Sequence, residues 1–338
     1  MPKIIISIMK YDYGVEERGY SYEYYNIYLP LLDEFGEGNV LLFDYYSEFK
    51  SLGKSVMNKN LFEFIKSEKP DIALFVLFEE EFVPGTIASL QEFTKTVIYF
   101  IDDPWRTDYV KKWRVHFNFF TTPDYFMLQK YKSENFANTI YSPFGFNPTI
   151  FKKLYLPYVY DVSFVGNYSP YRKWVISLLK KEGIKINVFG RGWKNEGGWV
   201  SQEKMAAIFN QSRINLNLSN AMYYDIDFLI HSLLSLRDIK ELLLLKKNKE
   251  QIKGRHYEIN GCGGFQLSYF VPGLNMVYEV DKEIAVYENV RNLGSEIKFY
   301  LQNEELRKSI ANKGYERSIT DHKAGKYLKN LVTYILNN

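Results

Sequence analysis

Short apolar runs alternate with amphipathic stretches along the whole chain, and this alternation limits the fold more than any other feature. Short apolar runs are typical of strands buried on both faces, and stretches with a helical apolar period are typical of crossover helices. The pattern therefore predicts an α/β fold built on parallel sheets. Strands are expected at residues 3–8, 40–43, 71–77, 96–101, 117–121 and 139–141, and then at 161–165, 185–189, 213–218, 265–267 and 284–286.

The helical pattern and a linker divide the chain into two α/β halves. Helices are expected at 22–35, 59–67, 86–92, 124–132, 171–181, 202–210, 227–247, from about 255, and at 291–302, 304–319 and 324–336. The segment 142–156 contains Pro143, Gly145 and Pro148 and reads as a linker. A length of 338 residues also suits two domains. We expect a ligand cleft between the halves, because doubly wound sheets bind ligands at the carboxyl ends of their strands.

Composition and charge exclude several classes of protein. The 43 basic and 40 acidic residues nearly cancel, so stable nucleic-acid binding is not expected. No apolar run is long enough for a transmembrane helix. Cys262 is the only cysteine, and the first residues do not resemble a secretory signal, so we expect a cytoplasmic protein. The four histidines have no zinc-binding spacing.

The strongest local motif is Lys253-Gly-Arg-His-Tyr-Glu258, followed by Gly261-Cys-Gly-Gly264. Two cations flank a glycine where a helix should begin, and a helix N-terminus with cationic side chains suits a phosphate. Glu258 lies one turn inside and can accept hydrogen bonds from two ribose hydroxyls. A solvated basic turn before a glycine-rich connection explains the same residues without a ligand.

Two predicted strands run directly into glycine. Asp161–Val165 is followed by Gly166 and Asn167, and the strand ending at Phe189 is followed by Gly190-Arg-Gly-Trp193. Glycine at a strand exit lets the backbone approach a ligand, although ordinary strand-to-helix turns also use it. Together with the cationic turn, the exits suggest one nucleotide-sized pocket. A dinucleotide site is not expected, because no G-x-G-x-x-G motif follows the first strand.

The residues from about 160 to 322 resemble the CgeB-like (spore maturation protein) glycosyltransferases, relatives of glycosyltransferase family 4 with the GT-B fold. The matching segments are Phe164–Asn167, Val188–Trp193, Ile214–Asn217, Gly254–Ile259, Gly261–Phe265, Glu279–Glu283, Gly314–Arg317 and His322. In the first half, Gly19–Asn26 and Ile101–Trp105 resemble the family's N-terminal segments. The resemblance implies two Rossmann-like domains that face a central cleft. It assigns 1–150, with 324–338 crossing back, to the acceptor side and 151–323 to the nucleotide sugar.

The resemblance also implies roles for individual residues. Lys253 and Arg255 would neutralise the donor diphosphate, and Glu258 would hold the ribose as the second Glu of a Glu-x7-Glu motif. Glu250 stands where the first Glu belongs, but its neighbours Lys246–Lys249 read equally well as an exposed helix end. The catalytic residues expected are Lys253, Arg255, Asp103 and Glu250. The donor-binding residues expected are Gly166, Asn167, Arg172, Gly190, Trp193, Gly254, His256, Tyr257, Glu258, Gly263 and Gly264.

No metal or other cofactor is expected. With two cations at the leaving phosphate the reaction needs no metal, and the second half has no Asp-x-Asp pair beside a strand. The nearest such sequence, Asp225-Ile-Asp227, is predicted to cap a helix.

In the first half, Asp102-Asp103-Pro104-Trp105 ends a predicted strand. Asp102 and Trp105 are expected to contact an acceptor and Asp103 to act as a base, while an aspartate cap before a helix explains the same residues. The loop 10–21 is a further candidate for the cleft wall. The run Glu79–Glu81 is interpreted chiefly as a solvated face.

Two other features have mainly structural interpretations. His116 is expected to be buried, and His322 to cap a helix. The apolar stripe Ile226–Leu234 is expected to lie in the core or in a homodimer face, with weak membrane association left open by the lysines that follow.

The sequence therefore predicts a metal-independent glycosyltransferase that uses a nucleoside-diphosphate sugar, with retention expected by analogy. The alternatives are a non-catalytic nucleotide-sugar-binding or assembly protein on the same scaffold and a sugar-nucleotide epimerase. The base, the sugar and the acceptor are not determined by the sequence.

Overall fold

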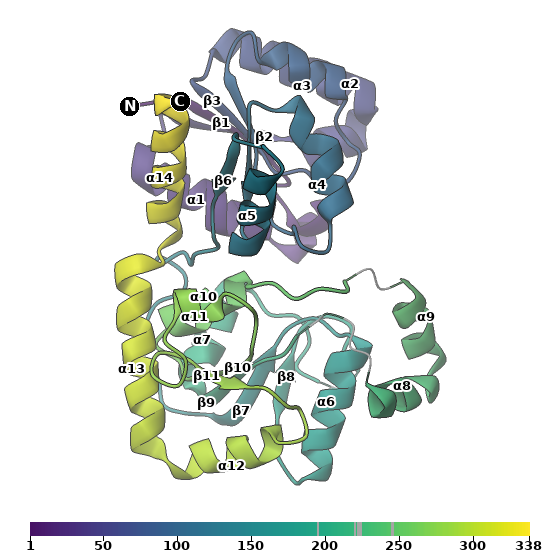
Figure 1. Cartoon of the computed structure of the whole chain (residues 1–338), viewed down its shortest axis with the longest axis vertical. Coiled ribbons are helices and arrows are strands. Elements are labelled where there is room, and N and C mark those ends of the chain that lie inside the picture. Colours follow the sequence, from purple (N-terminus) through teal and green to yellow (C-terminus); the bar gives the residue numbers. More distant parts are fainter. Residues whose placement is uncertain (195, 220, 222–224, 245–246) are drawn as a thin grey trace. The chain divides into compact units, whose positions relative to one another are not determined.

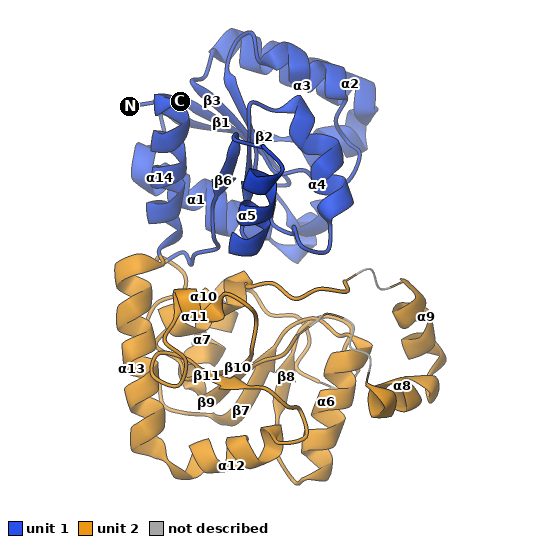
Figure 2. Cartoon of the chain, in the orientation of Figure 1, with its two compact units in different colours: residues 1–147, 323–338 blue, residues 148–322 orange. Residues whose placement is uncertain are grey.

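The computed structural model describes residues 1–194, 196–219, 221, 225–244 and 247–338. The chain divides into two compact units (Figure 2). Unit 1 comprises Met1–Asn147 and Lys323–Asn338, and unit 2 comprises Pro148–His322. The boundary at Asn147 lies within the predicted linker, and the last helix belongs to unit 1.

Unit 1 is built on a parallel sheet of six strands, in the order β2-β1-β3-β4-β5-β6. The strands are β1 (Ile4–Ile8), β2 (Val40–Asp44), β3 (Ile72–Phe75), β4 (Lys95–Ile98), β5 (Phe119–Thr122) and β6 (Thr139–Tyr141). All five residues of β1 are buried, because helices cover both faces of this sheet.

The main helices of unit 1 are α1 (Leu29–Phe35), α2 (Tyr45–Glu68), α3 (Pro84–Leu90), α4 (Thr107–Trp113), α5 (Tyr125–Ser133) and α14 (Ala324–Asn337). Short 3-10 turns lie at Asp12–Gly14, Glu16–Arg18 and Arg114–His116, and a π-helix at Tyr24–Tyr28 leads into α1. Asp44 and Asp124 cap α2 and α5 with side-chain oxygens.

The C-terminal helix completes the core of unit 1. Leu328, Leu331 and Ile335 of α14 pack in one apolar cluster with Ile4 and Ile6 of β1. Figure 1 shows α14 beside α1, far from it in sequence, and the two helices are in contact. A second cluster fills the space between the other face of the sheet and α2–α5.

Unit 2 is built on a parallel sheet of five strands, in the order β11-β10-β9-β7-β8. The strands are β7 (Tyr160–Val165), β8 (Asn187–Phe189), β9 (Ser212–Asn217), β10 (Gln266–Tyr269) and β11 (Ala285–Tyr287). The helices are α6 (Pro170–Lys181), α7 (Gln202–Gln211), α8 (Ile226–Leu233), α9 (Leu236–Leu244), α10 (Gly254–Gly261), α11 (Leu274–Val277), α12 (Leu293–Gln302) and α13 (Glu304–Asp321).

The predicted α/β fold with parallel sheets is confirmed, and the largest differences concern helix lengths. The helix expected at 59–67 is part of α2, which starts at Tyr45 and is interrupted by Gly53 at a φ of 82°. The helix expected at 227–247 is two helices, because α8 ends at Leu233 and α9 begins at Leu236. Its predicted residues 245 and 246 lie outside the described part of the chain.

Other predictions concerned a helix cap, the burial of two features and membrane-spanning helices. Asp225 caps α8 by accepting hydrogen bonds from the amides of Asp227 and Phe228, as predicted. Of the apolar stripe expected in the core or in a homodimer face, only Phe228 is buried, and Ile226, Leu229, Leu233 and Leu234 are exposed. His116 is only partly buried, because it ends a surface 3-10 turn. Within the described residues, no helix is both long and apolar enough to cross a bilayer.

Candidate functional site

The carboxyl edge of the unit 2 sheet brings together the loops predicted to bind a donor. The strands are parallel, so the segments that follow β7, β8 and β9 start at the same edge. Helix α10 precedes β10 and runs back along the sheet, so its N-terminus lies at that edge as well. We call the N-terminus of α10 and these loops the candidate site.

The N-terminus of α10 is held by a buried histidine. The backbone N–H of Lys253 donates to Nδ1 of His256 at 3.1 Å. His256 is fully buried, and burial lowers its pKa to about 4, so the ring is neutral at physiological pH. A neutral ring can accept this hydrogen bond, whereas an imidazolium cannot. His256 thus positions the cationic turn and is not expected to contact the donor.

Arg255 and Glu258 form an ion pair one turn into α10. Arg255 Nη1 and Glu258 Oε2 lie 2.7 Å apart, and the side chains are 24% and 4% exposed. Burial raises the pKa of Glu258, and the adjacent guanidinium opposes that rise. Arg255 also contacts Met205 Sδ and lies over the Phe209 ring, so α7 forms one wall beside it. A buried carboxylate and a part-exposed cation therefore lie side by side at the start of α10.

The two glycine exits are in direct contact. Gly190 has a φ of 133°, and a Cβ built there would lie 2.1 Å from the carbonyl oxygen of Gly166. The indole N–H of Trp193 donates to that same carbonyl at 2.8 Å, and the Arg191 amide donates to Asn167 Oδ1 at 3.4 Å. Glycine at 190 is required by both the backbone conformation and the space.

Arg172 ties these exits to the end of β9. Its guanidinium donates to the carbonyls of Asn167 at 2.8 Å, Leu218 at 2.9 Å and Ser219 at 3.1 Å. Burial lowers the pKa of Arg172 to about 10, with Arg255 among the further causes. Arg172 therefore positions these loops through their carbonyls, whereas its sequence context predicted a direct contact with the donor.

Glu250 lies near the cluster and outside any helix. It follows α9 by several residues and is part-buried, which differs from an exposed helix end. Its charge opposes the lowering of the Arg172 pKa by burial, and it adds to the rise that burial causes in the pKa of the Tyr171 hydroxyl. The structure thus brings Glu250 into the neighbourhood of Arg172, and Arg172 in turn interacts electrostatically with Arg255.

Three predicted donor residues lie elsewhere. Gly263 and Gly264 follow the C-terminus of α10, about 12 Å of helix from Gly254, at the amino edge of the sheet. There a Cβ on Gly263 would meet the Lys153 side chain, and one on Gly264 would meet the carbonyl oxygen of Phe209. Tyr257 is buried against the rings of Tyr278 and His322. Gly263 and Gly264 are thus separated from Lys253 by the length of α10, and Tyr257 packs against other rings, so the structure does not bring these three residues to the candidate site.

In unit 1, the structure places Asp103, which was expected to act as a base, in the core. It is fully buried, and its Oδ1 accepts a hydrogen bond from the Tyr131 hydroxyl at 2.7 Å. Burial raises the pKa of Asp103 to about 6. Asp102 and Trp105 are partly exposed and stay candidates, and Arg106 lies over the Trp105 ring.

The buried Asp103 predicts a pH-dependent stability. A carboxyl whose folded pKa is raised stabilises the fold at pH values below about 4, and that contribution is lost as pH rises through about 6. A rise of this size corresponds to about 3 kcal/mol. We expect Asp103→Asn to remove that loss, measured as the free energy of urea unfolding at about pH 4 and pH 7. Unchanged pH dependence in the variant would contradict this assignment.

Sequence reasoning missed two buried carboxylates. Glu81 is buried and accepts the backbone N–H of Glu79 at both oxygens, although the acidic run was interpreted as a solvated face. The apolar Phe82 that follows it is buried and is the signal that this turn enters the core. Asp238 is fully buried and binds Lys173 at 2.6 Å and the Tyr168 hydroxyl. No local signal marks it, because its partners are distant in sequence: Lys173 lies on α6 and Tyr168 in the loop before α6.

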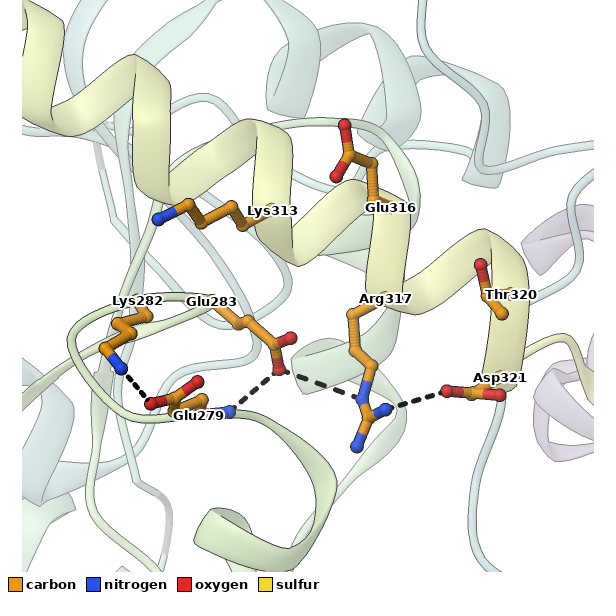
Figure 3. Close-up of a pocket in the computed structure, with 8 residues that line it drawn as sticks. All are labelled: Glu279, Lys282, Glu283, Lys313, Glu316, Arg317, Thr320 and Asp321. Carbon is orange, nitrogen blue, oxygen red and sulfur yellow. Dashed lines mark hydrogen bonds and ion pairs between the residues drawn. The ribbon is translucent and has the colours of Figure 1, made fainter.

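A polar pocket at the other end of α10 is occupied by its own ion pairs (Figure 3). Arg317 lies between Glu283, at 3.7 Å, and Asp321, at 2.9 Å, and Glu279 pairs with Lys282. The Glu283 carbonyl accepts from Asn260 near the C-terminus of α10. The main charges of this pocket are thus mutually neutralised, and it lies away from Lys253.

Comparisons with known proteins bear on the fold and on the second half of the chain. Residues 172–333 match a family model described as glycosyl transferase-like. HepE of Anabaena, solved in complex with UDP-glucose, is similar in structure with a TM-score of 0.68 over 100% of both chains, at 9% identity. The chain has the GT-B fold.

Other GT-B structures are similar over nearly their whole length. Sucrose-phosphate synthase of Thermosynechococcus elongatus has a TM-score of 0.66 at 9% identity and covers 99% of this chain and 98% of its own. A glycosyltransferase of Rickettsia africae has a TM-score of 0.63 at 13% identity, covering 100% and 99%. None of the curated proteins matches the sequence. At such identities the likeness to solved structures shows the fold alone. The range 172–333 that matches the glycosyl transferase-like family model includes all of α10.

Proposed function

We propose that this chain is a glycosyltransferase that transfers a sugar from a nucleoside-diphosphate sugar to an acceptor. The observation that carries the proposal is the N-terminus of α10, where Lys253, Arg255 and the buried Glu258 stand at the carboxyl edge of the unit 2 sheet. The glycosyl transferase-like match over residues 172–333 supports it. Membership of the CgeB-like group is part of the proposal.

The chemistry of the turn suits a diphosphate leaving group. When the bond to the anomeric carbon breaks, negative charge grows on the leaving phosphate. Fixed cations then stabilise the transition state more than the ground state. The helix dipole contributes about 0.3–1 kcal/mol, while a charge-assisted hydrogen bond contributes about 1.5–3 kcal/mol, so Lys253 and Arg255 would dominate.

Glu258 would serve the donor's ribose. Its buried carboxylate can accept hydrogen bonds from both ribose hydroxyls, and Arg255 would then be shared between this carboxylate and the diphosphate. Gly166, Gly190 and Gly254 would allow the donor to approach the backbone. Glu250, near Arg172, would face the donor sugar. The acceptor would contact Asp102 and Trp105 of unit 1.

Metal independence, retention of configuration and a cytoplasmic location are further parts of the proposal. No group of three or more His, Cys, Asp or Glu side chains suited to a metal ion occurs in the described part of the chain. Turnover unchanged in EDTA supports metal independence, and activity that appears only with a divalent cation contradicts it. The location rests on the single cysteine, Cys262.

The decisive experiment is incubation of the purified chain with UDP-, GDP-, ADP- and TDP-sugars, starting with UDP-glucose because HepE was solved with it. Release of the nucleoside diphosphate, or transfer to an added acceptor, supports the proposal. Binding without release or transfer would favour the non-catalytic nucleotide-sugar-binding protein. Conversion of one sugar nucleotide into another would favour an epimerase.

Replacing Glu258 with alanine is expected to weaken nucleotide binding about tenfold or more, because hydrogen bonds to a charged group contribute about 1.5–3 kcal/mol each. Titration calorimetry with UDP measures the effect. Glu283→Ala, at the opposite end of α10, is the matched control and should bind UDP as the wild type does. Equal affinity in the wild type and Glu258→Ala would discard the ribose assignment.

A further inference from the structure

Helices α8 and α9 present an apolar surface to solvent. Eight aliphatic side chains on or beside them are between 39% and 88% exposed: Ile226, Leu229, Ile230, Leu233, Leu234, Leu236, Leu243 and Leu244. We call these residues the α8–α9 surface. Figures 1 and 2 show both helices beside α6 at the periphery of unit 2. Large contiguous apolar surfaces are uncommon on monomeric proteins and mark interaction sites.

The spacing along α8 places its exposed side chains on one face. Residues 226, 229, 230 and 233 follow the helical period, and the opposite face buries Phe228 and Ser232. Phe228 packs against the rings of Tyr171 and Trp174 of α6. The helix therefore has one apolar anchor in the core and a second apolar face that no neighbouring element covers within the described residues.

Polar contacts fix the orientation of α9. Asp238 is fully buried, accepts from the Tyr168 hydroxyl and pairs with Lys173 at 2.6 Å. Arg237 lies over the Tyr168 ring at 3.9 Å and donates to the Gly192 carbonyl at 2.9 Å. Turning Leu236 inward would break a buried ion pair, which is costly. The outward leucines are thus a built feature of the fold.

The carboxylates beside this surface form ion pairs with arginines, whereas two exposed lysines beside it are available to a ligand. Arg291 binds Asp225 at 3.0 Å and Asp227 at 2.7 Å, and Arg237 binds Glu241 at 3.0 Å. Lys240 is exposed one turn from both Leu236 and Leu244, and Lys249 is exposed after the helix. Neither lysine forms an ion pair with a described residue. Neutralised carboxylates and available ammonium groups match an anionic surface.

We propose that the α8–α9 surface binds the interface of an anionic lipid bilayer, with both helices lying along the membrane plane. Aliphatic side chains beside lysines are typical of helices that insert into the interfacial region. Protein interfaces instead concentrate aromatic residues and arginine. Here the exposed residues are aliphatic, and the Arg237 guanidinium is held within unit 2, because it donates to the Gly192 carbonyl. The proposal is independent of glycosyl transfer.

Cosedimentation with vesicles of phosphatidylcholine and phosphatidylglycerol in about equal amounts tests the proposal. We expect the whole chain to bind these vesicles. The variant Leu234→Glu/Leu236→Glu should bind them with an affinity lower by about tenfold or more. Leu306→Glu, an exposed leucine of α13, is the matched control and should bind normally. Both variants should keep the wild-type thermal midpoint, because the substituted side chains lie at the surface.

Charge reversal provides a second test. Lys240→Glu/Lys249→Glu should reduce binding to the anionic vesicles, and wild-type binding should fall at high salt. Absence of wild-type vesicle binding, or equal binding by Leu234→Glu/Leu236→Glu, overturns the proposal. A dimer in sedimentation velocity that this leucine variant dissociates, without wild-type vesicle binding, would instead assign the surface to a second copy.

Discussion

Lys253→Ala/Arg255→Ala is expected to lower glycosyl transfer by about 10²–10⁴-fold. Each cation would make a charge-assisted hydrogen bond to the leaving diphosphate worth about 1.5–3 kcal/mol, and each 1.4 kcal/mol changes a rate about tenfold. Nucleoside-diphosphate release from the best donor measures the effect. The double variant Lys282→Ala/Lys313→Ala removes the same charge from the pocket at the other end of α10 and should retain activity.

The ion pair of Arg255 allows stability and catalysis to be separated. Arg255→Ala leaves the buried carboxylate of Glu258 without its cation, so the variant should also be less stable. Adding Glu258→Gln removes that buried charge and should restore the thermal midpoint without restoring transfer. Full transfer by Lys253→Ala/Arg255→Ala, or recovery of transfer together with stability, would remove the diphosphate role from these cations.

Gly190→Ala is expected to destabilise the protein by about 3 kcal/mol or more and to abolish nucleotide binding. The new Cβ would lie 2.1 Å from the Gly166 carbonyl oxygen, at a φ of 133° that is nearly closed to other residues. The loops after β7 and β8 would have to separate. Urea unfolding and UDP calorimetry measure the two effects.

Gly198→Ala is the matched control for that variant. Gly198 also has a positive φ, of 67°, but a Cβ there would meet no atom within 4 Å. Only the cost of the left-handed backbone, about 1–2 kcal/mol, is expected. Equal losses in the two variants would show that the contact between the glycine exits does not decide the geometry of the candidate site.

Sequence periodicity determined the α/β architecture, because the apolar pattern that distinguishes a strand from a helix is set by residues close together in the chain. The runs at Ile4–Ile8 and Asp161–Val165 identify buried strands without knowledge of their neighbours. The cap at Asp225 and the helix start after Lys253 are equally local, since each depends on backbone groups within one turn. These features were predicted correctly.

Only the tertiary structure decided what each charged or apolar side chain contacts. Arg172 donates to carbonyls of Leu218 and Ser219, distant in sequence, and Asp103 is buried under Tyr131 of another helix. Gly263 is close to Lys253 in sequence, but α10 holds the two at opposite ends. The leucines beside Asp238 face outward because Tyr168 and Lys173 hold its carboxylate inside. Each outcome depends on a partner brought in by the fold, which residue spacing alone does not specify.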